Sequence, residues 1–135
     1  MTRTSKNHQN ESRNSSTGHY VDGFVFAVPK KNLKAYRAMS HKVGKITREH
    51  GALDYKECVG DDLNTKWGIP FPRKMKLKPN ETVIFSYIVY KSRAHRDRIN
   101  AKVMNDPRLA NMDSKSMPFD MKRMVHGGFK ILVSL

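Results

Sequence analysis

The chain has 135 residues, 38% hydrophobic and 28% charged, a composition typical of one globular domain with a single core. No apolar run approaches the ~18 residues of a membrane-spanning helix, so the sequence excludes an integral membrane protein. The 26 lysines and arginines exceed the 12 acidic residues and give a formal net charge of +14, which favours anionic partners.

Residues 1–19 form a polar segment rich in Asn, Ser and Thr, with almost no apolar side chains after Met1. It cannot bury enough apolar surface to offset the entropy of ordering, so we expect a disordered tail followed by one domain over residues 20–135. The segment also lacks the hydrophobic stretch of a secretory signal. Cys58 is the single cysteine and cannot form a disulfide within the chain, so we expect a cytoplasmic protein.

The first predicted elements are a strand and a helix. The strand runs from Tyr20 to Val28 and ends at Pro29, which has no backbone N–H to donate. Apolar residues then recur at helical three- and four-residue steps, at Leu33, Tyr36, Met39, Val43 and Ile46. Asn32 is a candidate N-cap for this helix, and Gly51 stands where a left-handed residue would end it.

The middle of the chain is predicted to hold a second strand, an aromatic loop and a short extra strand. Ala52 to Gly60 alternates apolar and polar side chains, which is typical of a partly exposed strand. Asp61 to Pro72 combines glycine and prolines with Trp67, so we expect an irregular loop that packs in part. Arg73 to Lys78 carries a lysine at every second position, which predicts a short edge strand protected from further pairing.

The last part is predicted to contain a strand, a helix and a final strand. The third strand runs from Thr82 to Tyr90. Ser92 can cap a second helix that continues to about Asp106, where Pro107 stops it. After a second loop, the final strand is expected from Phe129 to Leu135.

The first, third and last of the main strands are apolar on both faces. In the first strand, for example, Phe26 points to one face and Val25 to the other. The order strand, helix, strand, strand, helix, strand is that of the ferredoxin-like fold, whose two helices cover one face of an antiparallel sheet. A second copy is the simplest cover for the other face. The sequence therefore predicts an α+β, ferredoxin-like βαββαβ domain with a short extra strand, which pairs as a dimeric α+β barrel.

Five side chains are candidates for binding a small molecule between the helices and the sheet: Asp22, Cys58, Trp67, Arg123 and His126. Asp22 and His126 would meet if the first and last strands pair, either for proton transfer or, more commonly, as a buried hydrogen-bonded pair. Asp61 and Asp62 follow Cys58 closely, and their negative charges disfavour the thiolate form of a reactive cysteine. The more ordinary role of Cys58 is that of a small, buried apolar side chain. The histidines form no metal motif, and we expect no metal or cofactor.

Nucleic acid is a less favoured partner. The second predicted helix carries cations at Arg93, Arg96, Arg98 and Lys102, as a phosphate-binding surface would. However, the chain lacks the basic and aromatic strand motif with which a ferredoxin-like sheet stacks bases. A solvated basic surface is the simpler interpretation.

Several segments are specific enough to compare with a known family. They are Tyr20-Val-Asp-Gly-Phe-Val, His50-Gly51-Ala52-Leu53, Asp106-Pro107-Arg108, Met117-Pro-Phe-Asp120 and Gly127-Gly128-Phe129. Together they resemble the YbaA-like family of small bacterial proteins, which carry no assigned activity. The resemblance implies a dimeric α+β barrel and implies no reaction.

The leading functional hypothesis is a cytoplasmic homodimer that binds a small molecule in a cleft between helices and sheet, and the positive net charge makes an anion one candidate. Because barrels of this shape include cofactor-free and haem-degrading monooxygenases, an enzyme of that kind is the first alternative, with Trp67, Asp22 or His41 as candidate site residues. Non-specific nucleic-acid binding through the second helix is the other alternative.

Overall fold

A computed structural model describes residues 18–113 and 115–135, so nearly all of the predicted polar tail lies outside the described residues. The described chain is an α+β domain with a four-stranded sheet in the order β2-β3-β1-β4. All neighbouring strands are antiparallel. The strands are β1 (Tyr20–Pro29), β2 (Asp54–Val59), β3 (Glu81–Tyr90) and β4 (Val125–Lys130). This order is compatible with the predicted ferredoxin-like fold.

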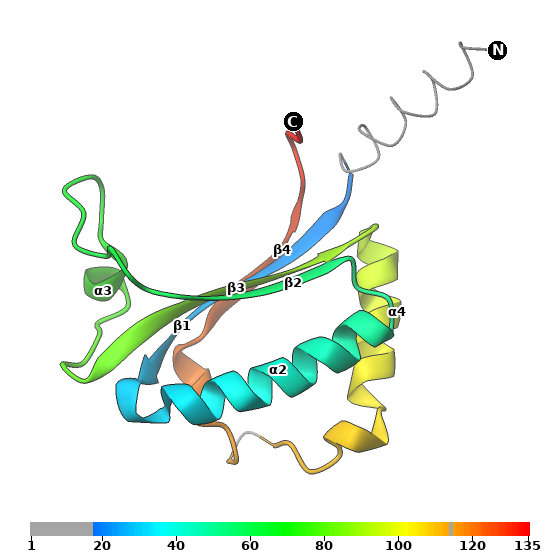
Figure 1. Cartoon of the computed structure of the whole chain (residues 1–135). Helices are drawn as coiled ribbons and strands as arrows, with labels where there is room; N and C mark the ends of the chain where they lie inside the picture. The colour runs from blue at the N-terminus through cyan, green and yellow to red at the C-terminus, as the bar shows by residue number, and fades with distance from the viewer. Residues whose placement is uncertain (1–17, 114) are drawn as a thin grey trace.

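Two long helices, α2 (Leu33–Glu49) and α4 (Arg93–Met104), lie on the same side of the sheet (Figure 1). Ser92 caps α4 as predicted, because its hydroxyl accepts a hydrogen bond from the His95 backbone N–H at 3.1 Å. Gly51 follows α2 at a φ of +118°, also as predicted. Asn32 occupies the N-cap position of α2, but its side chain donates to the Pro118 carbonyl at 2.9 Å instead of capping the helix. None of the helices in the described ranges is long and apolar enough to cross a bilayer.

The core fills the space between the helices and the sheet in two clusters. One contains Tyr20, Ala52, Tyr90 and Ile99. The other contains Phe26, Val28, Tyr36 and Ile84. Phe119, from the loop before β4, stacks on Phe26 at a ring-centroid distance of 4.4 Å and so closes the second cluster.

The predicted extra strand at Arg73 to Lys78 is wrong, because this segment forms the end of the short helix α3 (Phe71–Lys74) and a turn. Proline stands at the start of α3, where its fixed φ suits the first helical turn. Lys76 then adopts a φ of +51°, which is incompatible with a continuous strand. The alternating lysines thus reflect exposure on a turn.

The predicted bounds of the last strand are also corrected, since β4 covers Val125–Lys130 and the chain beyond it is irregular. Gly127 and Gly128 lie inside the strand, opposite Gly23 and Asp22. A Cβ atom on Gly128 would lie 2.2 Å from the Tyr20 hydroxyl oxygen, so the aromatic ring requires this glycine. Gly128 is therefore a packing requirement within the sheet.

The second face of the sheet is apolar, and neither α2 nor α4 covers it (Figure 1). At one end of this face Ala27 and Val83 are buried. Register places Val25 beside Phe85 and Val125, and Val21 beside Phe129, on this face. Phe85 is 46% exposed, and Val125 and Phe129 are each 61% exposed. The prediction of strands that are apolar on both faces is therefore confirmed for β1 and β3 but is wrong for the last strand, because β4 carries His126 and Lys130 on its helix side.

Candidate functional site

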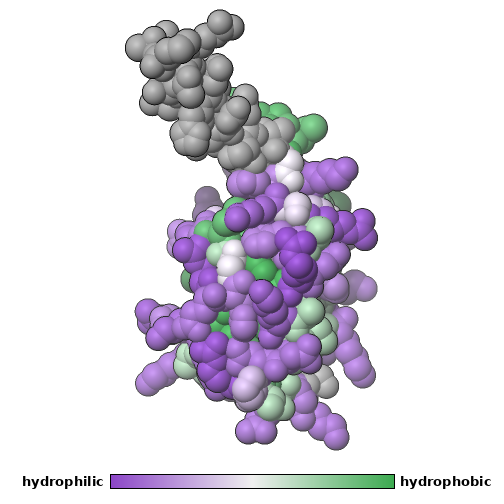
Figure 2. Space-filling model, turned by 90° about the vertical axis from the view of Figure 1, so that its right-hand side faces the viewer, coloured by the Kyte–Doolittle hydropathy of each residue, from purple (hydrophilic) through white to green (hydrophobic). Residues whose placement is uncertain are grey.

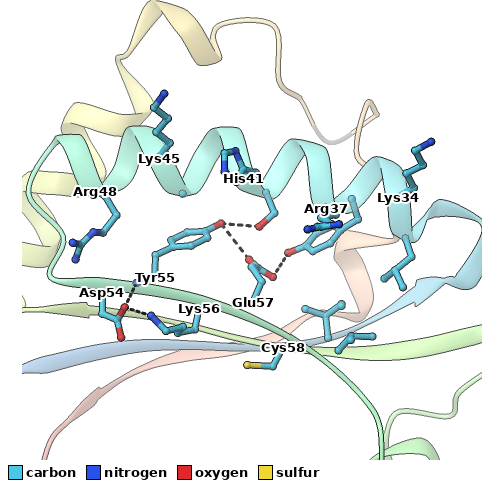
Figure 3. A pocket seen from close by; sticks show the side chains of 16 residues that line it. Lys34, Arg37, His41, Lys45, Arg48, Asp54, Tyr55, Lys56, Glu57 and Cys58 are labelled. Carbon is cyan, nitrogen blue, oxygen red and sulfur yellow. Dashed lines mark hydrogen bonds and ion pairs between the residues drawn. The ribbon is translucent and has the colours of Figure 1, made fainter.

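A groove of about 830 Å³ lies between helix α2 and the edge strand β2. Tyr55 and Glu57 point from the strand toward the helix, while the Cys58 thiol points away from it (Figure 3). This follows from strand geometry, because alternate side chains of β2 face opposite sides of the sheet. Ile84 of the neighbouring strand β3 also lines the groove.

The floor of the groove contains a network of hydroxyl groups around Glu57. The Tyr36 hydroxyl donates to Oε2 of Glu57 at 2.6 Å, and the Tyr55 hydroxyl donates to Oε1 at 3.2 Å. The Ser40 and Tyr55 hydroxyl oxygens are also 3.2 Å apart. Burial raises the pKa of both tyrosines well above the usual value, and the Glu57 charge raises it further. Both phenols therefore remain neutral hydrogen-bond donors around physiological pH.

Gly44 of α2 makes room for this network. A Cβ atom at this position would lie 2.5 Å from Cε1 of Tyr55, far inside van der Waals contact. Glycine inside a helix costs about 0.5–1 kcal/mol relative to alanine. The fold accepts this cost because the Tyr55 ring can then lie directly under the helix.

We expect Gly44→Ala to lower the free energy of unfolding by about 1–2 kcal/mol, because the methyl group overpacks the Tyr55 ring. Urea unfolding followed by circular dichroism measures the change. Ala38→Gly, at an exposed position on the same helix, reports the propensity effect alone. A Gly44→Ala protein that gains about 1 kcal/mol, as helix propensity predicts, would contradict the contact.

Basic residues recur along the α2 side of the groove at three- and four-residue steps. We call Lys34, Arg37, His41, Lys45 and Arg48 the basic stripe. Among the described residues, Lys34, Arg37 and Lys45 form no ion pair. The Lys34 and Lys45 ammonium groups point away from β2 on long stems at the groove mouth (Figure 3). Arg48 bends toward the strand and donates to the Ala52 carbonyl at 3.2 Å.

The structure gives Asp22 and His126 separate partners. Asp22 is buried and accepts a hydrogen bond from Arg96 at 2.6 Å, while the Arg96 guanidinium lies 4.9 Å from the centre of the Tyr20 ring. His126 lies opposite Phe24 and stacks on it, with ring centroids 6.0 Å apart. The two candidates come from paired strands but form no hydrogen bond with each other.

The other three predicted ligand residues also lie in different places. Cys58 is exposed at the border of the groove, and Trp67 is 88% exposed in the connection between β2 and α3. Arg123 donates to both Glu81 oxygens, at 2.6 and 3.0 Å, and to the carbonyl of Lys76 at 3.2 Å. It holds the turn after α3 against the start of β3.

The residues proposed for other functions do not form a second site. The monooxygenase candidates lie apart: Trp67 in a loop, Asp22 on the sheet under α4, and His41 on α2 among the residues that line the groove. On α4, Arg96 is committed to Asp22, whereas Arg93, Arg98 and Lys102 are exposed. The side of the molecule on which α4 lies is predominantly hydrophilic (Figure 2). Within the described ranges, no three potential metal ligands lie close enough together to hold an ion.

Sequence reasoning missed the groove residues Tyr36, Ser40, Tyr55 and Glu57. One signal was present, because Glu57 interrupts the apolar alternation of β2 on the face that turns toward the helix. The recurrence of cations along α2 was a second signal. Neither becomes meaningful until the helix and the strand are placed side by side.

Comparison with known proteins gives consistent matches. The model of a family described as "Protein of unknown function (DUF1428)" matches residues 19–121. The "Uncharacterized protein YbaA" of Escherichia coli strain K12 is 44% identical over 114 residues, which cover 84% of this chain and 97% of the relative. The protein of the same description from Shigella flexneri gives the same values. The predicted resemblance to YbaA-like proteins is confirmed.

Proposed function

This chain belongs to the DUF1428 family of proteins of unknown function, and we propose that it binds a small anionic molecule in the groove between α2 and β2. The observation that carries the proposal is the basic stripe beside a sizeable cavity. Arg37 and Lys45 border the groove without an acidic partner in the described part of the chain. An anion bound beside Arg37 would supply the opposite charge that this guanidinium lacks.

The dimensions and chemistry of the groove support a small ligand. Its volume of about 830 Å³ falls within the range of ~300–1,000 Å³ common for small-molecule sites. Leu33, Val59 and Ile84 supply apolar surface, while Ser40 and the two tyrosines supply hydroxyl groups. In small-molecule sites an apolar lining buries most of the ligand, while a few oriented polar groups fix its orientation.

We also propose that the protein is a cytoplasmic homodimer, in which the open sheet face of each copy covers that of the other. Support comes from the exposure of Phe85, Val125 and Phe129 on one continuous face. A two-fold arrangement buries the same patch on both copies, as most homodimers do. The unpaired Cys58 suits a reducing compartment.

Sedimentation velocity of the full chain tests the assembly. We expect a dimer at micromolar concentration, and we expect Phe85→Glu to shift the protein to a monomer because a charge would be buried in the shared face. Lys102→Glu, on the exposed side of α4, changes charge away from that face and should leave the dimer intact. A wild-type chain that sediments as a monomer would refute the assembly.

Binding of butylphosphonate, measured by isothermal titration calorimetry, tests the groove. We expect the double variant Arg37→Ala/Lys45→Ala to bind this anion at least tenfold more weakly than the wild type. Arg93→Ala/Lys102→Ala removes the same charge from α4 and should change the affinity less than twofold. Equal losses in both variants would mean that net charge, not the groove, attracts the anion. Titration of the wild type and of Arg93→Ala/Lys102→Ala with a short DNA duplex tests whether α4 binds phosphates, because only then should the variant bind DNA more weakly.

A further inference from the structure

Glu57 differs from the other partly or fully buried carboxylates of this fold. Asp22 pairs with Arg96, Glu81 with Arg123, and Asp106 with Arg108. Glu57 is half-buried and lines the groove, yet within the described residues it forms no ion pair. In a chain with 26 lysines and arginines, the carboxylate in the cavity is held by neutral hydroxyl groups.

The Glu57 carboxylate retains free acceptor capacity. A carboxylate offers about four lone-pair positions, and the two tyrosine hydroxyls occupy one on each oxygen. These hydroxyls also fix its orientation, because their donors come from different elements, α2 and β2. The remaining lone pairs can accept hydrogen bonds from a group that enters the groove.

Two basic residues that line the groove, Lys56 and Arg48, contact groups other than Glu57. Lys56 projects from the opposite face of β2 and contacts Asp54, and Arg48 donates to backbone carbonyls. Arg37 of α2 lies on the helix side of the groove (Figure 3). Asp54 also lines the groove but pairs with Lys56, so Glu57 is the carboxylate on the strand side that has no cationic partner among the described residues.

We propose that the ligand of this groove is a zwitterion, a small molecule whose acidic group binds near Arg37 while its protonated amine binds Glu57. The amine supplies the cation that Glu57 lacks, in a charge-assisted hydrogen bond that is stronger than one between neutral groups. The inference rests on the proposed function and adds the second charge of the ligand. A simple anion would occupy only the helix side and leave Glu57 without a cationic partner.

A matched series of ligands tests this inference on the full chain. We propose isothermal titration with ω-aminoalkylphosphonates of two to four methylenes, each compared with the alkylphosphonate of the same length. We expect at least one amine to bind about tenfold more tightly than its alkyl counterpart. In Glu57→Gln, which keeps the shape but removes the charge, the two affinities should converge.

Three further measurements separate the possible results. Asp61→Asn removes one exposed negative charge outside the groove and should preserve the preference for the amine. Tyr36→Phe removes one of the two hydroxyls that orient the Glu57 carboxylate and should reduce the preference for the amine, so it tests the role of Glu57 if the Glu57→Gln protein fails to fold. Thermal unfolding reports on folding in each variant.

If alkylphosphonates bind and no amine exceeds its counterpart, the zwitterion is refuted while the anion-binding function stands. An amine preference that survives in a folded Glu57→Gln protein would likewise refute the role of Glu57. If neither series binds, the proposed function itself fails.

Discussion

Replacing Asp22 by alanine is expected to lower the free energy of unfolding by about 3 kcal/mol, as when one partner of a buried ion pair is removed. Asp22 is 7% exposed and lies 2.6 Å from Arg96, whose side chain is 18% exposed and packs over Tyr20. Without Asp22, a guanidinium held between α4 and the sheet loses its buried partner. The estimate is at the low end of the usual 3–5 kcal/mol because Arg96 also contacts Asp97. Urea unfolding followed by circular dichroism gives the value.

Two variants make this prediction specific. Asp97→Ala removes the second carboxylate near Arg96, but its side chain is 62% exposed, so the loss should stay below about 1 kcal/mol. The double change Asp22→Leu/Arg96→Met removes both buried charges and should recover most of the stability lost in Asp22→Ala. If Asp22→Ala unfolds like the wild type, Asp22 is free for the ligand role that its sequence position suggested.

Arg123→Met is expected to cost about 2–3 kcal/mol, from the loss of hydrogen bonds to a charged group. Its guanidinium contacts both oxygens of Glu81 and the carbonyl groups of the turn at Met75 and Lys76. Lys122→Met, at the adjacent exposed position, is the matched control and should have little effect. Chemical unfolding at neutral pH provides the comparison.

The stability lost in Arg123→Met should also depend on pH, and the sign of this dependence follows from the pKa of Glu81. The hydrogen bonds from Arg123 lower the pKa of Glu81 below its usual value of 4.5. A carboxyl group whose pKa is lower in the folded state stabilises the fold above its unfolded pKa, and this stability is lost as the pH falls through the folded pKa. The difference between wild type and Arg123→Met should therefore be constant above about pH 5 and shrink toward pH 3. A difference that does not change with pH would show that Glu81 is not the partner that matters.

Local signals in the sequence predicted the elements whose causes are local. Ser92 and Gly51 mark helix ends because capping and left-handed conformations depend on one or two residues. The apolar residues of β1 and β3 likewise predicted that both faces of these strands carry apolar side chains. The confirmed order of strands and helices followed from these patterns.

The errors arose where distant contacts decide the structure. The segment around Met75 and Lys76 is a turn partly because Arg123, far along the chain, binds its carbonyls. Gly128 belongs to a strand because it pairs with Asp22 of β1, far earlier in the chain, and it is glycine because the Tyr20 ring occupies the space of a side chain. The groove could not be predicted for the same reason, since Tyr36 and Glu57 become one unit only when α2 crosses β2.

The groove and the open face draw on different parts of the sequence. Apart from Ile84, every residue that lines the groove falls within the continuous stretch from Leu33 to Val59. The exposed aromatic and aliphatic residues of the opposite face come from β3 and β4, beside partly buried residues of β1. Substitutions in one helix and the strand after it can therefore alter the proposed ligand site without touching the surface proposed for self-association. Under these two proposals, relatives could keep one mode of assembly while the groove between α2 and β2 changes its chemistry.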